Sequence, residues 1–219
     1  MRLFKFRSLE RTEHVLDIVF KERLHCAPYD QLNDPFEGVF LSVIQSGGLG
    51  THPLGSGPLG AMGETTIAAS ISQLQSDVDS RVCSLSETMN DVRLWSHYAN
   101  GHRGIAIEIE LEDVAPLHQV SYREKLAEFS GGFLSKQPTT IELLTMKTKH
   151  WEYEKEYRLI TGSEFYDVRG RIKGVFLGLR ISEVMQRLML RSTPAHVPVF
   201  ATKLNTRAVT VEVRQQLER

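Results

Sequence analysis

Cysteine is scarce in this chain, which limits both covalent cross-linking and metal binding. Cys26 and Cys83 are the only two cysteines among 219 residues, and no Cys-x-x-Cys pair occurs. Two isolated cysteines cannot build a disulfide framework or a typical zinc site. His97 and His102 lie five residues apart, which misses the i,i+4 spacing of two ligands on one helix face. The sequence predicts no bound metal and a reducing, cytoplasmic setting.

Long apolar runs and an excess of one charge are also missing. No stretch approaches membrane-spanning length, and residues 1–7 alternate apolar with basic side chains, unlike a signal peptide. The formal net charge is −1, which argues against bulk electrostatic attachment to nucleic acid or to an anionic membrane. A local basic groove remains compatible with this charge. We therefore expect no membrane partner.

The order of helical and extended patterns predicts the fold class. Helical spacing occurs over 10–21, 65–78, 91–98, 141–147 and 182–191. Extended patterns occur over 1–7, 23–27, 81–86, 104–110, 119–122, 151–161, 172–179, 197–203 and 209–213. Strands dominate without regular β-α alternation, which predicts an α+β fold with mixed, mainly antiparallel sheets and flanking helices in a single domain over 1–219.

Residues 46–63 interrupt this pattern with seven glycines among proline and serine. Such a composition predicts a flexible Gly/Pro-rich insertion. The segment has no Gly-Lys-Ser/Thr ending, so a phosphate-binding P-loop is not supported.

The segment 149–160, Lys-His-Trp-Glu-Tyr-Glu-Lys-Glu-Tyr-Arg-Leu-Ile, crowds three carboxylates among aromatic residues. If it is extended, Glu152, Glu154, Glu156 and Arg158 share one face of a strand. Repulsion between neighbouring carboxylates can raise one pKa toward neutrality, as often occurs at catalytic sites. The alternative is a solvated charged face that pairs with an adjacent strand.

Five short clusters occur in an order that resembles a bacterial family of unknown function, DUF2971. They are Leu3 to Leu9, Leu32 to Glu37, Cys83 to Glu87, Leu94 to Ala99 and Trp151 to Arg158. The resemblance covers most of the chain outside the 46–63 insertion. It implies a bacterial protein and brings no established activity with it.

A second resemblance is to ADP-ribosyltransferases of the Arg, Ser-x-Ser, Glu-x-Glu type, whose motifs lie in that order on strands lining an NAD cleft. The matching positions are Arg7, Ser84-Leu85-Ser86 and Glu154-Lys155-Glu156. Leu85 departs from the Thr or similar small residue that is usual there. The resemblance implies NAD as the substrate and an ADP-ribosyltransferase-like fold.

The same resemblance implies a role for each matching residue. Arg7 would hold an NAD phosphate, while Ser84 and Ser86 would order the cleft wall. Glu156 would hydrogen-bond the nicotinamide ribose and stabilise the oxocarbenium-like charge, and Glu154 would position or deprotonate the acceptor. Trp95 or Tyr98 would stack on the nicotinamide.

The expected function is an NAD-dependent transfer of ADP-ribose to a protein or nucleic-acid acceptor, or to water, in bacterial defence or toxin action. One alternative is a non-enzymatic binding or regulatory module that uses the charged strand as an interaction edge. Another is a metal-dependent nuclease or phosphoesterase with the carboxylates Asp34, Glu37, Glu154 and Glu156. No lysine follows an Asp or Glu at two residues' distance, so the common Asp/Glu-x-Lys arrangement of nucleases is missing.

Overall fold

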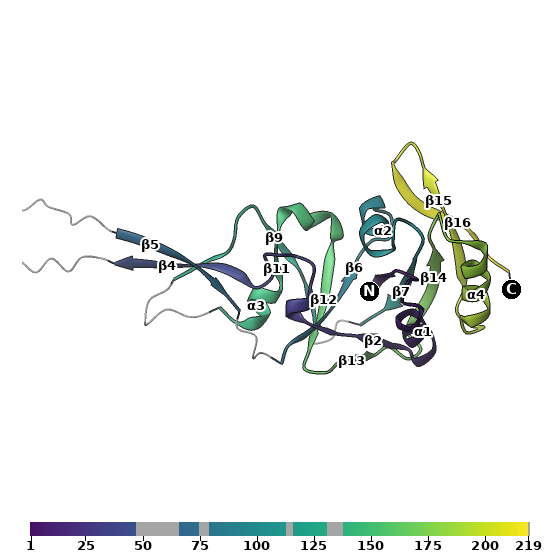
Figure 1. The fold of residues 1–219 in the computed structure, drawn as a ribbon, viewed down its shortest axis with the longest axis horizontal. Helices are drawn as coiled ribbons and strands as arrows, with labels where there is room; N and C mark the ends of the chain where they lie inside the picture. Colours follow the sequence, from purple (N-terminus) through teal and green to yellow (C-terminus); the bar gives the residue numbers. More distant parts are fainter. Residues whose placement is uncertain (47–65, 75–78, 113–115, 131–137, 219) are drawn as a thin grey trace, which may run out of the picture.

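A large, mostly antiparallel sheet organises the molecule (Figure 1). The computed structural model describes residues 1–46, 66–74, 79–112, 116–130 and 138–218. Within them, a nine-stranded sheet has the order β16-β15-β14-β7-β1-β6-β12-β8, with β3 also pairing with β6. Its strands are β1 (Arg2–Arg7), β3 (Ala27–Pro28), β6 (Arg81–Ser86), β7 (Ile105–Glu110), β8 (Leu117–Gln119), β12 (Glu156–Thr161), β14 (Ile172–Leu177), β15 (Val199–Asn205) and β16 (Thr210–Gln216). The pairing of β14 with β15 is parallel, and the other pairings in this sheet are antiparallel.

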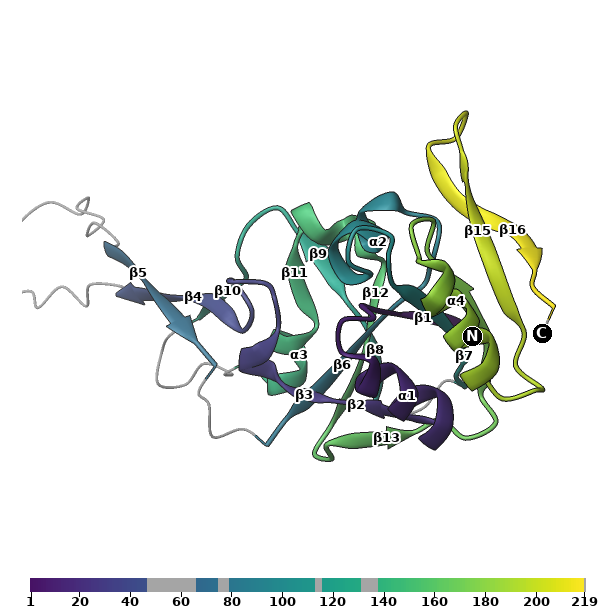
Figure 2. The ribbon, with the colours of Figure 1, turned by 45° about the vertical axis from the view of Figure 1, so that its right-hand side comes forward.

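Smaller sheets and short helices surround this sheet, so the α+β prediction is confirmed. The other strands are β2 (Arg23–His25) with β13 (Phe165–Asp167), β9 (Ser121–Arg123) with β11 (Met146–Thr148), and β4 (Val39–Ser46) with β5 (Thr66–Gln73) and β10 (Glu128–Ser130). The helices are α1 (Thr12–Lys21), α2 (Val92–Tyr98), α3 (Thr140–Leu144) and α4 (Glu183–Ser192), with 3-10 turns η1 (Tyr29–Gln31) and η2 (Lys149–Glu154). Figure 2 shows the β4–β5 hairpin reaching away from the main body. No helix in the described part of the chain is both long and apolar enough to cross a membrane.

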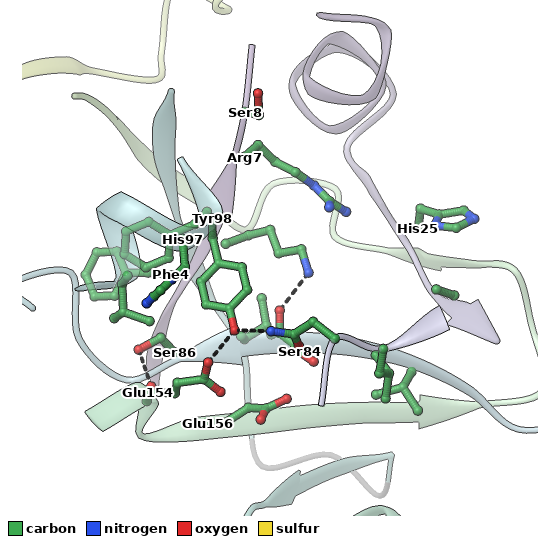
Figure 3. Close-up of a pocket in the computed structure, with 18 of the residues that line it drawn as sticks. Phe4, Arg7, Ser8, His25, Ser84, Ser86, His97, Tyr98, Glu154 and Glu156 are labelled. Carbon is green, nitrogen blue, oxygen red and sulfur yellow. Dashed lines mark hydrogen bonds between the residues drawn. The ribbon is translucent and has the colours of Figure 1, made fainter. Parts of the chain in front are cut away.

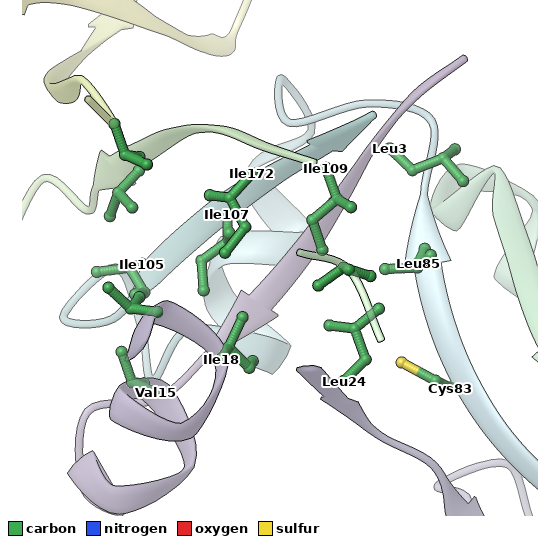
Figure 4. Packing of buried hydrophobic residues seen from close by; sticks show 14 of the residues in the cluster. Leu3, Val15, Ile18, Leu24, Cys83, Leu85, Ile105, Ile107, Ile109 and Ile172 are labelled. Atoms are coloured by element: carbon green, nitrogen blue, oxygen red, sulfur yellow. The ribbon is translucent and has the colours of Figure 1, made fainter. Parts of the chain in front are cut away.

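Alternating side chains of the central strands build a core on each face of the sheet. On one face, Val15 and Ile18 of α1 pack in a cluster with Leu3 of β1 and the isoleucines of β7 (Figure 4). On the other face, Trp95 of α2 packs in a second cluster with Phe6 of β1. Because successive side chains of a strand point to opposite faces, β1 and β7 contribute to both cores and hold α1 and α2 on either side of the sheet.

The structure corrects the helix predicted over 65–78 and describes only the first residue of the predicted insertion. The segment 65–78, predicted as a helix, contains strand β5, which pairs with β4 over eight residues, from Val39↔Gln73 to Ser46↔Thr66. Pairing with a distant strand therefore outweighs the local helical spacing. Of the predicted insertion 46–63, Ser46 ends β4, and residues 47–63 lie outside the described residues.

Candidate functional site

The candidate site lies where two neighbouring strands of the central sheet separate. In the described structure β1 and β6 share one register pair, Phe4↔Ser86, whereas β1 pairs with β7 and β6 pairs with β12 over six positions each. Beyond that pair the Nζ of Lys5 bridges the gap by donating to the carbonyl oxygen of Ser84 at 2.7 Å. A cavity of about 520 Å³ opens beside this gap (Figure 3). This volume is typical of small-molecule sites.

One end of the cavity is basic. Its lining includes Lys5, Arg7, Arg11, His14 and His25. None of the first three forms an ion pair with a carboxylate within the described residues, and the Nε of Arg7 is buried without a hydrogen-bond partner there. Burial lowers the pKa of both Lys5 and Arg7, and the nearby Cys83 thiol offsets this effect only in part. This end therefore suits an anionic group such as a phosphate.

The opposite end is acidic and closely hydrogen-bonded. The Nζ of Lys147 lies 2.7 Å from Oε2 of Glu154 and 2.8 Å from Oε2 of Glu156. The hydroxyl of Tyr98 donates to Oε1 of Glu154 and accepts a hydrogen bond from Nδ2 of Asn33 at 2.7 Å. Figure 3 shows Tyr98, Ser86 and Glu154 together at this end, away from Arg7. Both carboxylates line the cavity and are buried.

A fully buried arginine, Arg158, is hydrogen-bonded to the carboxylates of the acidic end. Arg158 donates from Nε to Oε1 of Glu156 at 2.8 Å and from Nη2 to Oε2 of Glu37 at 2.9 Å. Its Nη1 donates to the carbonyl oxygen of Leu144 at 2.6 Å. With Lys147, the network contains two cations and three carboxylates, which leaves one negative charge when every group is ionised. A cation entering the cavity would meet this excess charge in a medium of low dielectric constant.

The two cavity carboxylates have different proton affinities. Burial raises the pKa of Glu154, and this effect outweighs the Lys147 ammonium and the Tyr98 hydroxyl. Burial also opposes ionisation of Glu156, but Arg158 and Lys147 together outweigh it and lower the pKa of Glu156 to about 2. Pairs of carboxylates whose pKa values are pushed apart often divide into a proton-transferring group and a permanently charged group.

The chain turns sharply between these carboxylates, which corrects the predicted strand over 151–161. Residues up to Glu154 form the 3-10 turn η2, Lys155 has a left-handed conformation with φ of 44°, and β12 starts at Glu156. Glu154 and Glu156 therefore both point inward, as an uninterrupted strand would also place them, but Glu152 is exposed instead of sharing their face. Ser86 fixes the turn because its Oγ donates to the carbonyl oxygen of Glu154 at 2.6 Å.

Six of the seven residues expected to form the site line this one cavity. They are Arg7, Ser84, Ser86, Tyr98, Glu154 and Glu156. Trp95 is the exception, because it is fully buried, donates from Nε1 to the carbonyl oxygen of Met89 at 2.6 Å and packs edge-to-face on Phe6. This placement corrects the expectation that Trp95 could stack on a ligand and leaves Tyr98 as the candidate.

Sequence reasoning missed Lys147 and the basic residues of α1 and β2. Lys147 fell at the end of a predicted helix, 141–147, whereas it lies in the short strand β11, pairs with Tyr122 of β9 and is buried. No local pattern indicates that this lysine lies under the acidic segment. The nearest signal is the unbalanced negative charge of 152–156, which needs a cation from elsewhere if it is buried.

The carboxylates proposed for a metal-dependent nuclease do not form a metal site in the described residues. No group of three or more His, Cys, Asp and Glu side chains there is arranged to hold a metal ion. Oδ1 of Asp34 accepts the backbone N–H of Phe36 at 2.9 Å, while Glu37 is paired with Arg158.

Comparison of the chain with protein-family models, with curated proteins and with solved structures finds no match. The two family resemblances therefore remain predictions from the motifs, and the geometry of the cavity carries the functional argument.

Proposed function

We propose that the chain is an NAD-dependent ADP-ribosyltransferase-like enzyme whose cavity binds NAD and transfers ADP-ribose to a protein or nucleic-acid acceptor, or to water. The observation that carries the proposal is the meeting of Arg7, Ser84, Ser86, Glu154 and Glu156 around one cavity. These residues come from β1, from β6 and from the consecutive elements η2 and β12, three regions that are widely separated in the sequence. Chance matches to three common motifs would have no reason to converge on one cavity.

The distribution of charge along the cavity suits the two halves of NAD. Lys5 and Arg7, which form no ion pair with a carboxylate within the described residues, would bind the negatively charged diphosphate. The acidic end would take the nicotinamide ring, which is a cation while it is bound to ribose. The ring of Tyr98 lies there to pack against a flat heterocycle.

The two carboxylates would divide the chemistry. As the bond between ribose C1′ and the nicotinamide nitrogen breaks, the electron pair goes to the ring nitrogen and leaves positive charge on the ribose. Glu156, which stays ionised, would stabilise that charge. Glu154, whose pKa is raised, would take the proton of the attacking hydroxyl, amine or water. The products are free nicotinamide, one proton and the ADP-ribosylated acceptor.

Nicotinamide release from NAD by the purified chain tests this proposal. We expect Glu156→Gln to lower the rate by about 10²–10³-fold, because it removes the charge opposite the developing cation. We expect Arg7→Ala to lower kcat/KM through weaker NAD binding. Glu152→Gln and Arg169→Ala are matched controls, because both residues are exposed and neither lines the cavity. Folding of each variant is confirmed by circular dichroism.

The result that overturns the proposal is a wild-type chain that neither releases nicotinamide nor gains thermal stability with NAD. A rate unchanged in folded Glu156→Gln would also overturn the role of that carboxylate. The second candidate, a non-enzymatic binding module, is favoured by one observation: Glu156 already bonds to two cations, Lys147 and Arg158, at 2.8 Å each. A folded chain that ignores NAD would support that candidate, because such a module uses the charged strand as an interaction edge.

A further inference from the structure

The two cysteines of the chain face each other across neighbouring strands. Strands β3 and β6 are antiparallel, with Ala27 opposite Val82 and Pro28 opposite Arg81. Extending this register by one residue places Cys26 opposite Cys83. Both cysteines carry free thiols and are buried, at 0% and 1% exposure. Cysteines that are 57 residues apart in sequence are thus neighbours in space.

The backbone around Cys26 indicates how close the two residues lie. The N–H of Cys26 donates to the carbonyl oxygen of Glu164 at 2.7 Å, on the side away from β6. Cys26 and Cys83 therefore occupy the non-hydrogen-bonded type of antiparallel pair, in which the Cα atoms lie about 4.5 Å apart. This separation falls within the range of about 4.4–6.8 Å found across disulfides. The Sγ of Cys26 donates to the carbonyl oxygen of Leu24 at 3.9 Å, and the nearness of the two thiols shifts the pKa values of both.

The surroundings favour a thiolate at Cys83. The neighbouring Cys26 thiol is the largest influence, and with the positive charges of Lys5 and Arg7 it outweighs burial and lowers the pKa of Cys83 to about 6. The same pairing raises the pKa of Cys26. Figure 4 shows Cys83 pointing into the apolar cluster beside Leu24 and Leu85. An ionised thiol is the nucleophilic form in redox chemistry.

The pair lies directly behind the wall of the cavity. Ala27, Val82 and Ser84, which are the chain neighbours of the two cysteines, all line the cavity. Lys5 connects the two regions, because its Nζ bonds to the carbonyl oxygen of Ser84 while its charge acts on Cys83. Neither cysteine lines the cavity itself, so an oxidant reaches the sulfurs only when this wall opens locally.

We propose that Cys26 and Cys83 form a reversible disulfide and so make a redox-modification site behind the cavity wall. The oxidant is a hydroperoxide. The Cys83 thiolate attacks the peroxide, the O–O bond breaks, and Cys83 becomes a sulfenic acid as the peroxide leaves as water or alcohol. The sulfur of Cys26 then displaces the sulfenic oxygen as water, and the S–S bond forms. In sum two thiols are oxidised and one peroxide is reduced, and a dithiol reductant reverses the reaction.

The site does not depend on NAD chemistry, so its test uses mass rather than activity. The folded chain is treated with hydrogen peroxide, quenched with a thiol-alkylating reagent and weighed intact. We expect the loss of two hydrogen atoms without alkylation, and recovery of two alkylated cysteines after treatment with dithiothreitol. Because the chain has two cysteines, an intramolecular disulfide can join no other pair. Pre-positioned thiols should react about tenfold faster, or more, in the folded chain than in urea.

Single variants identify the order of the steps. In Cys26→Ser, we expect Cys83 to gain oxygen atoms, because no second thiol resolves the sulfenic acid. In Cys83→Ser, we expect Cys26 to stay reduced over the same time. The proposal is overturned if the folded wild-type chain keeps both thiols, forms the disulfide no faster than in urea, or forms only intermolecular disulfides. If a serine variant fails to fold, the comparison of disulfide formation between the folded wild-type chain and the chain in urea still tests the proposal.

Discussion

A single lysine, Lys147, holds the two cavity carboxylates in place. Its Nζ lies within 2.8 Å of both Glu154 and Glu156, and its side chain is 3% exposed. Without it, two buried carboxylates would lie side by side with Arg158 as their nearest cation. Breaking a buried ion pair by removing one partner is strongly destabilising, because the remaining charge is left without compensation.

We therefore expect Lys147→Met to lower the free energy of unfolding by about 3–5 kcal/mol. The measurement is urea denaturation followed by tryptophan fluorescence. Lys149→Met is the matched control, because Lys149 is exposed and forms a surface ion pair with the exposed Glu124. The control should change stability little. Equal unfolding midpoints for the two variants would contradict the structural role of Lys147.

The low pKa of Glu156 predicts how stability depends on pH. Its pKa is about 2 in the folded chain and about 4.3 in an unfolded chain, so the unfolded state binds more protons between these values. The stability that Glu156 contributes is fully present above pH of about 4.3 and is lost as the pH falls toward 2. Glu156→Gln removes this titration.

The check on Glu156 is the difference in unfolding free energy between wild type and Glu156→Gln, measured from neutral pH to pH of about 2.5. We expect the difference to shrink steadily below pH of about 4.3. A constant difference across this range would show that Glu156 titrates alike in the two states.

At the scale of elements, the join between η2 and β6 determines where Glu154 lies. Oγ of Ser86 donates to the carbonyl oxygen of Glu154 at 2.6 Å and accepts the N–H of Thr88 at 3.2 Å. The backbone N–H of Glu87 donates to the carbonyl oxygen of Lys155 at 3.0 Å. The side chain of Ser86, the second serine of the Ser-x-Ser motif, thus holds the acidic turn by a hydrogen bond to the backbone of Glu154. A residue that orders the wall of a cleft would act in this way.

Ser86→Ala should cost about 1–3 kcal/mol, because it leaves buried backbone groups without their hydrogen-bond partner. Ser84→Ala is the natural comparison, since Lys5 bonds to the backbone carbonyl of Ser84, which alanine retains. Thermal unfolding of both variants checks the expectation. A loss in Ser84→Ala as large as that in Ser86→Ala would contradict the anchoring role.

The elements that were predicted from sequence are those whose pattern is local. The helical spacing of 10–21 corresponds to α1, and the alternation of residues 1–7 corresponds to β1. Strand β5 and the turn η2 were missed, because a distant strand specifies the first and a left-handed Lys155 specifies the second. Neither the distant strand nor the left-handed residue produces a recognisable pattern within a short window of sequence.

In the site, too, only features with a local signal in the sequence were predicted. Residue types with evident chemistry, such as Arg7 and Glu156, could be selected from sequence, and they line the cavity. Lys147, the partner of Glu154 and Glu156, could not be selected from the sequence. It reaches these carboxylates only through the pairing of β11 with β9 and the turn that follows. Trp95 was misjudged for a related reason: its neighbours in sequence line the cavity while its own ring faces the core.

At the scale of the whole molecule, the central sheet both builds the core and opens to form the cavity. Strand β1 remains paired with β7 along its length while its other edge leaves β6 after Phe4↔Ser86. The cavity beside the separated edges is lined by Lys5 and Arg7 of β1 on one side and by Glu154 and Glu156, beyond β6, on the other. A ligand that spans both ends would therefore join two halves of the sheet, and its binding should stabilise the entire fold.

We expect NAD to raise the Tm of the wild-type chain. A ligand present at about 100 times its Kd adds about 2.7 kcal/mol to the free energy of unfolding, which corresponds to about 5–10 °C for a chain of this size. Nicotinamide alone should give a much smaller shift, because it lacks the diphosphate that Lys5 and Arg7 would bind. Arg7→Ala should lose most of the NAD shift, whereas Arg169→Ala, an exposed arginine away from the cavity, should keep it. If Arg7→Ala and wild type shift equally, NAD binds elsewhere, and the basic end of the cavity serves a different anion.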